Sequence, residues 1–314
     1  MTMLHPGRAM TGAATPKMQV PTQNEFAAFF DRLDGPANLE GRIVDGRYRI
    51  GTVIGSGNMC DVYSAIDESG RKVALKFAAD RLATPIEESS RFLRREIEAL
   101  SRISQENVVG FVDVGFAEGM EFLVMEYLEG MQLERIIGPG LPWEYAKPFL
   151  TQLCNALEAA HNAAVVHGDL KPGNILVLDD EGRRILKLID FGLAKFTDAP
   201  DGDAERTPPG VIAGTIAYMA PEQLAGKDFD RKADIHAAGV IMYEMLSGRR
   251  PYDAGSFSAY AIVEQIRKAR PLPLSELGVI IPGGANAVMM RALEKDPEKR
   301  FQTAAEMREA IASL

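Results

Sequence analysis

The chain has 314 residues, of which 46% are apolar and 25% charged, as expected for an ordinary globular protein with a large core. Its formal net charge of −9 argues against nucleic acid or an anionic membrane as the main partner. The sequence contains no run of about 18 apolar residues and no hydrophobic signal core, so we expect no membrane partner. Cys60 and Cys154 are its only cysteines, which favours a cytoplasmic protein without a structural disulfide.

An extension of 44 residues precedes the first regular pattern. Residues 1–21 are rich in Ala, Gly, Thr and Pro without periodicity, and we expect them to be disordered. An apolar stripe with helical spacing then predicts a short helix over 24–34. This helix could lie on the neighbouring lobe, or it could dock a regulatory protein or a second copy of the chain. The stripe consists of Phe26, Phe29, Phe30 and Leu33.

The pattern becomes that of successive β-strands from Arg47 onward. Gly55 and Gly57 stand in the first turn, where glycine lets backbone N–H groups approach a phosphate closely. The same pattern is also typical of a plain hairpin. The next strand contains Lys76 among apolar residues, and a buried ammonium is costly unless a carboxylate pairs with it. The sequence therefore predicts a partner for Lys76.

A helix is predicted over 87–101, and it contains Glu96. Glu96 could be that partner, or it could be a solvated helix carboxylate. The inward stripe of this helix consists of Phe92, Leu93, Ile97 and Leu100.

Two more strands are predicted over 108–114 and 121–127, and the chain becomes mainly helical after Gly130. A long helix is expected over 143–164, with Pro148 near its first turn, where proline is tolerated.

Two short apolar runs, 175–178 and 185–189, flank a turn signal and predict a hairpin. Polar residues that are not explained by the apolar pattern stand before the first strand and after the second strand. Because the two strands of a hairpin are antiparallel, these two groups of polar residues should lie close together. Two carboxylates, an amide and an ammonium at one place could hold a divalent metal and a phosphate beside a hydroxyl nucleophile. Asx side chains also cap turns, which is the plainer alternative. The polar residues are His167, Asp169, Lys171 and Asn174 at one end, and Asp190 and Gly192 at the other.

A polar loop rich in Pro, Gly and Asp follows over 196–213 and leads into the run 214–222. His236 lies on a later helix, where we expect it to be packed in the core rather than to bind a ligand.

These segments carry motifs that resemble those of eukaryotic-type (Hanks-type) serine/threonine protein kinases, in the same order. The resemblance covers about residues 45–312, and the compact form of the chain resembles soluble bacterial members of the family. The matching runs are VALK at 73–76, HGDLKPGN at 167–174, DFG at 190–192, APE at 220–222, DIHAAG at 234–239 and the final DPEKRF run at 296–301.

The resemblance implies an α+β, bilobal protein kinase fold. A small antiparallel β N-lobe with one main helix would span residues 45–126, and a larger, mostly helical C-lobe would span 127–314. It also implies a buried ion pair between Glu222 and Arg300.

The activity implied is ATP-dependent phosphorylation of serine and threonine hydroxyls on protein substrates, including the chain itself. Asp169 would orient the substrate hydroxyl and accept its proton, and Lys171 would neutralise charge on the transferred phosphoryl group. Thr215 would form a hydrogen bond beside them. Lys76, held by Glu96, would fix the α- and β-phosphates of ATP.

Asn174 and Asp190 would supply oxygen ligands to Mg²⁺ or Mn²⁺. The family pattern also implies a set of residues around the nucleotide. They are Ile54, Gly55, Gly57, Val62, Ala74, Lys76, Met125, Glu126, Leu128 and Leu176.

Three positions depart from the family pattern: Cys60 replaces a loop glycine, Gly168 an arginine and His236 a tryptophan. The arginine of the family pairs with a phosphate on the activation loop, and glycine cannot make that pair. We therefore predict activity that depends less on phosphorylation of this loop, although Thr197 and Thr207 remain candidate phosphorylation sites.

Two other functions fit parts of the sequence. A pseudokinase would bind nucleotide or partners without transfer, and the three departures favour it. A small-molecule phosphotransferase is also conceivable, because HGDLKPGN resembles the H-G-D-x-x-P-x-N loop of aminoglycoside and choline kinases. Those enzymes usually have histidine at the position of Lys171 and lack the A-P-E run.

Overall fold

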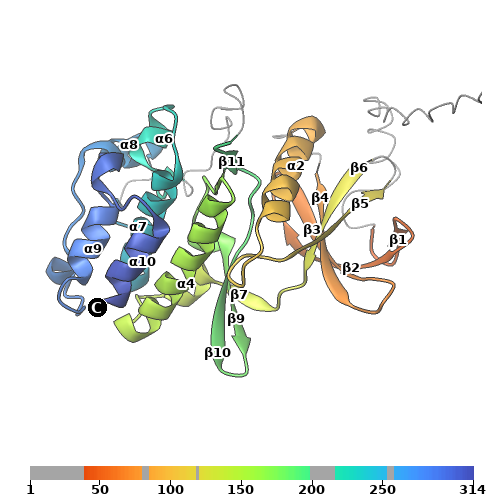
Figure 1. The fold of residues 1–314 in the computed structure, drawn as a ribbon, viewed down its shortest axis with the longest axis horizontal. Coiled ribbons are helices and arrows are strands. Elements are labelled where there is room, and N and C mark those ends of the chain that lie inside the picture. The colour runs from red at the N-terminus through yellow and green to blue at the C-terminus, as the bar shows by residue number, and fades with distance from the viewer. Residues whose placement is uncertain (1–38, 80–84, 118–119, 199–215, 253–257) are drawn as a thin grey trace, which may run out of the picture.

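The computed structural model describes residues 39–79, 85–117, 120–198, 216–252 and 258–314, so the helix predicted over 24–34 lies outside the described residues. The described chain forms an antiparallel β-sheet with one long helix, joined to a larger and mainly helical part (Figure 1). This architecture confirms the expected α+β class.

The first part is a sheet whose six strands run in the order β1-β2-β3-β4-β6-β5, every pair antiparallel. Its strands are β1 (Ile43–Val44), β2 (Tyr48–Ser56), β3 (Cys60–Ile66), β4 (Lys72–Ala78), β5 (Phe111–Ala117) and β6 (Met120–Glu126). Helix α2 (Ile86–Arg102) packs on this sheet with Phe92, Leu93 and Leu100 buried, as the apolar stripe predicts. Glu96 lies on the same buried face.

The second part is built around α7 (Arg231–Ser247), which is buried along nearly its whole length. Helix α4 (Trp143–Asn162) packs between α7 and α10. Helix α4 ends two residues before the predicted end, and Pro148 lies in its second turn. None of the described helices is both long and apolar enough to cross a bilayer. The other helices are α3 (Leu133–Ile137), α6 (Pro221–Leu224), α8 (Ala259–Lys268), α9 (Ala285–Ala292) and α10 (Ala304–Ala312), with single turns at Pro172–Asn174, Leu274–Leu277 and Pro297–Lys299.

The predicted hairpin is formed by β9 (Ile175–Asp180) and β10 (Arg183–Leu188), with β7 (Gly130–Gln132) on the open side of β9. Its two-residue turn contains Glu181 and Gly182 at φ values of 51° and 87°. A tight turn of the primed type requires two such left-handed residues. Next to the hairpin, β8 (Val165–Val166) pairs with β11 (Lys195–Phe196).

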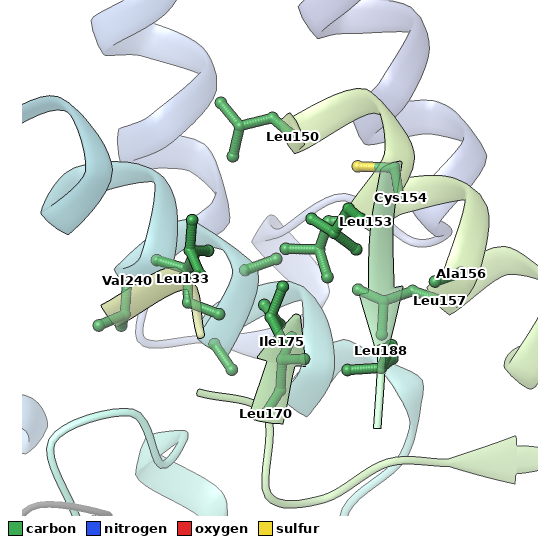
Figure 2. Close-up of a cluster of buried hydrophobic side chains, with 14 of the residues drawn as sticks. Leu133, Leu150, Leu153, Cys154, Ala156, Leu157, Leu170, Ile175, Leu188 and Val240 are labelled. Carbon is green, nitrogen blue, oxygen red and sulfur yellow. The ribbon is translucent and has the colours of Figure 1, made fainter. Parts of the chain in front are cut away.

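The core beneath the hairpin holds the polar residues in place. Figure 2 shows Leu170, Ile175 and Leu188 in one buried cluster with side chains of α4. Each of the three is at most 2% exposed. Because Leu170 separates Asp169 from Lys171, its burial fixes where both polar side chains leave the backbone.

Arg300 and Glu222 form the buried ion pair that the resemblance implies. The Arg300 side chain is fully buried and bonds both Glu222 oxygens, at 2.7 and 2.8 Å. Its remaining N–H groups donate to the carbonyl oxygens of Glu294, Lys232 and Lys295. One side chain therefore joins α6, α7 and the turn before α10.

Replacing Arg300 should destabilise the fold strongly. In Arg300→Ala the Glu222 carboxylate and three carbonyl groups lose their donor, which should lower the free energy of unfolding by about 3–5 kcal/mol. Arg183→Ala is the matched control, because Arg183 pairs with Glu106 on the surface, where such pairs contribute about 1 kcal/mol or less. Urea unfolding of both variants measures the difference, and equal losses would contradict the role assigned to Arg300.

Candidate active site

Lys76 lies between two carboxylates that come from different parts of the chain. Its Nζ is 2.5 Å from Glu96 Oε2 on α2 and 3.1 Å from Asp190 Oδ1, two residues beyond β10. The Lys76 and Glu96 side chains are 11% and 2% exposed, so their charges are largely removed from water. The pairing of Lys76 with Glu96 agrees with the sequence prediction and excludes a solvated Glu96.

The charges of this trio explain its pKa values. Burial lowers the pKa of Lys76, but Asp190 and Glu96 outweigh that effect and keep the pKa above its usual value. Burial raises the pKa of Glu96 to about 6, against the opposing influence of Lys76. Partial desolvation also favours neutral Asp190, yet Lys76 outweighs it and lowers the pKa of Asp190 to about 2. All three groups are therefore charged above pH 7.

A second polar group surrounds Asp169. Lys171 Nζ donates to Asp169 Oδ2 at 2.7 Å, and Asn174 Nδ2 donates to the Asp169 carbonyl at 2.9 Å and to Oδ2 at 3.3 Å. The loop that makes these contacts is closed by the single turn Pro172–Asn174. Asp169 thus has a fixed position, and one of its oxygens takes both side-chain donors.

The two polar groups are joined at the base of the hairpin, as its geometry predicts. The Ile189 N–H donates to the Asn174 carbonyl at 2.9 Å, which ties the residue before Asp190 to the Asp169 loop. His167 packs its ring 4.7 Å from that of Phe191, and both side chains are fully buried. The structure therefore brings the predicted polar residues of both hairpin ends to one place.

Asp234 is a structural determinant of the site to which the sequence analysis assigned no role. Its buried carboxylate accepts the backbone N–H groups of His167 and Gly168, at 2.9 and 3.0 Å, and lies 2.9 Å from His161 Nε2. Burial opposes its ionisation, but His161 outweighs burial and the pKa of Asp234 is lowered. The signal available in the sequence was the position of Asp234 at the start of the DIHAAG run, in a largely apolar helix.

The residues expected around the nucleotide lie mostly on the sheet. Gly55 pairs with Val62 across β2 and β3, and Ala74 pairs with Met125 across β4 and β6. Ile54 is exposed, while Val62, Leu128 and Leu176 are half-buried. The Glu126 N–H already donates to Gly110 O, so a bond from Glu126 to adenine would have to use its carbonyl.

Cys60 begins β3, and its carbonyl accepts the Gly57 N–H at 3.0 Å, which closes the glycine turn. The thiol is buried, and burial raises its pKa to about 12. A thiol with that pKa has almost no thiolate at neutral pH, so a redox-sensitive Cys60 is disfavoured.

The donor set fits a magnesium-bound nucleotide. Asp190 is ionised and its side chain is 45% exposed, so carboxylate oxygen remains accessible. The Asn174 amide nitrogen is committed to Asp169, which leaves the amide oxygen as a ligand. Two hard oxygen donors beside a fixed ammonium would suit a divalent cation. Thr207 and Thr215 lie outside the described residues.

His236 is the buried core residue that the sequence predicts. It is fully buried and stacked on Tyr252, with ring centroids 6.3 Å apart. Burial lowers its pKa well below the usual value, so the ring is neutral.

Comparisons with known proteins agree with this geometry. The chain matches the protein kinase domain family over residues 48–311. It is 36% identical over 275 residues to the serine/threonine-protein kinase pkn2 of Myxococcus xanthus, covering 86% of this chain and 33% of that protein. It is 34% identical over 284 residues to "Probable serine/threonine-protein kinase PknB" of Corynebacterium glutamicum, covering 87% and 43%.

The chain therefore spans less than half the length of these curated relatives. The family match nevertheless covers most of the chain, and it includes both polar groups of the candidate site. The chain belongs to the protein kinase family, with bacterial Hanks-type serine/threonine kinases among its relatives.

Proposed function

We propose that the chain is an active protein kinase that transfers the γ-phosphoryl group of ATP to serine and threonine hydroxyls of protein substrates, itself included. One observation carries the proposal: the Lys76–Glu96–Asp190 trio and the Asp169 group are both assembled and joined through Ile189. The names of the relatives, which are serine/threonine-protein kinases, support the same reaction class.

Each group has a role in phosphoryl transfer, which needs positioning and neutralisation of charge more than covalent chemistry. Asp169 orients the substrate hydroxyl and accepts its proton, and Lys171 offsets charge on the transferred group. Lys76 binds the α- and β-phosphates. Asn174 and Asp190 would hold Mg²⁺ or Mn²⁺, which supplies positive charge against the phosphates.

The wider organisation is proposed on the same basis. Residues 45–126 would form the N-lobe and residues 127–314 the C-lobe of a cytoplasmic kinase. The extension before residue 45 would dock a regulatory protein or a second copy of the chain. Thr215 would contact Asp169 and Lys171 in the active state.

The alternative of a pseudokinase rests on Cys60, Gly168 and His236. Against it, the five charged and polar residues of the proposed machinery, Lys76, Glu96, Asp169, Asn174 and Asp190, are all present and assembled. The small-molecule alternative is weakened by the Glu222–Arg300 pair, which anchors the A-P-E run to the helical core.

Removing the Asp169 carboxylate should abolish transfer. Incubating the purified chain with labelled ATP and Mg²⁺ should phosphorylate serine or threonine residues, as read by intact mass and site mapping. Asp169→Asn should lower the rate by about 100-fold or more, because the group that accepts the proton is lost. Asp180→Asn, at an exposed carboxylate on the same hairpin, should leave the rate unchanged. No incorporation by wild type, on itself or a generic protein, with nucleotide still bound, would favour the alternatives.

Activity should fall in acid as Glu96 gains a proton. Because the pKa of Glu96 is about 6, protonation below that pH removes the carboxylate partner of Lys76. Above pH 7, Glu96→Gln should lower kcat/KM for ATP about 10- to 100-fold, as expected for a lost charged hydrogen bond of about 1.5–3 kcal/mol.

The pH profiles of the two enzymes provide the test. The wild-type profile should have an acid limb near pH 6 that the Glu96→Gln profile lacks. ATP titrates identically in both assays, so only their difference reports Glu96. Parallel profiles would contradict the assignment.

A further inference from the structure

Lys195 and Asp228 meet although 33 positions separate them in the chain. Lys195 belongs to β11, just after the Asp190 loop, and Asp228 lies between α6 and α7 (Figure 1). Lys195 Nζ donates to Asp228 Oδ1 and, at 2.8 Å, to the Phe229 carbonyl. It also lies 5.2 Å from the centroid of the Phe229 ring. We call these three residues the Lys195 latch.

The latch connects the two described ends of the chain segment that runs from the Asp190 loop to α7. One described end of this segment is tied to the catalytic loop, because Lys195 pairs with Val166, the residue before His167. The other end is tied by Gln223, whose Nε2 donates to the Gly168 carbonyl at 2.9 Å. The latch joins these two ends directly to each other.

Gly168 lies beside the latch. A Cβ at this position would lie 3.7 Å from the Phe229 ring, which is an ordinary van der Waals distance. The φ of +75° at Gly168 is strained for any residue with a Cβ, and such a Cβ would lie 3.0 Å from the Leu193 carbonyl. The latch therefore packs directly against the catalytic loop at the residue before Asp169.

The exposure of the Lys195–Asp228 ion pair indicates that it positions the chain and contributes little to the free energy of unfolding. The Asp228 side chain is 80% exposed and that of Lys195 is 22% exposed. Lys195 lowers the pKa of Asp228, so the carboxylate is charged throughout the neutral range. Exposed pairs of this kind contribute little to folding, whereas a contact between two distant points of a chain restricts where the intervening residues can go.

We propose that the Lys195 latch is a positioning device for phosphoryl transfer. It uses a carboxylate of the chain itself to hold the two ends of the segment beside Asp169, so the kinase is competent before any phosphate is added to that segment. The inference rests on the proposed function and adds a role for three residues outside the reacting groups. Thr197 is consistent with it, because its hydroxyl already donates to the Ala164 carbonyl at 3.3 Å.

The test compares full-length enzymes that have been treated with a phosphatase and checked by intact mass. Dephosphorylated wild type and the double variant Thr197→Ala, Thr207→Ala should keep kcat within about threefold of the untreated enzyme. Asp228→Asn and Lys195→Met should lower kcat/KM for a protein substrate about three- to tenfold while KM for ATP changes less than twofold. Lys195→Arg should retain most activity.

Lys232→Met is the matched control, because Lys232 also binds two carboxylates on this surface, those of Asp230 and Glu298, but is not one of the three latch residues. Its kinetic constants should not change, and thermal melting of every variant should stay near wild type.

The latch is refuted if Asp228→Asn and Lys195→Met behave like Lys232→Met. It is also refuted if the dephosphorylated wild type is folded and inactive while the phosphorylated enzyme is active. Inactivity of both phosphorylated and dephosphorylated wild type would instead refute the proposed kinase function.

Discussion

The active site depends on the burial of one ammonium group. Lys76 lies inside the sheet, where a charge is tolerated only beside opposite charges, and it has Glu96 and Asp190. Because Glu96 belongs to α2 and Asp190 to the loop after β10, the requirement of one lysine brings the sheet, its helix and the helical part into a single arrangement. Loss of either carboxylate would leave an incompletely compensated buried charge and a displaced helix or loop.

A second buried charge organises the catalytic loop. Asp234 is fixed in α7, and it orients the backbone of His167 and Gly168 rather than any side chain of the loop. Apolar residues complete the task, because Leu170, Ile175 and Phe191 lie in the core directly beside polar residues of the site. The backbone that carries the reacting side chains is therefore positioned through neighbouring residues.

Two ion pairs farther from the reacting groups differ in how deeply they are buried. The Glu222–Arg300 pair is enclosed, has five hydrogen bonds from one guanidinium, and joins elements of the helical core. The Lys195–Asp228 pair is largely exposed and joins the two ends of a single segment. The first arrangement suits stability and the second suits control of geometry, although both use the same pair of charge types.

The sequence by itself determined the strands, α2, the hairpin and the need of Lys76 for a partner. Alternating apolar residues, glycine turns and the cost of an unpaired buried charge are local or nearly local constraints. Its ordered motifs also identified the residues of the candidate site. Only the tertiary structure decided that Asp234 holds the catalytic loop, that the Cys60 thiol is buried and that Lys195 meets Asp228. Those features depend on burial and on contacts between distant segments, which no local pattern encodes.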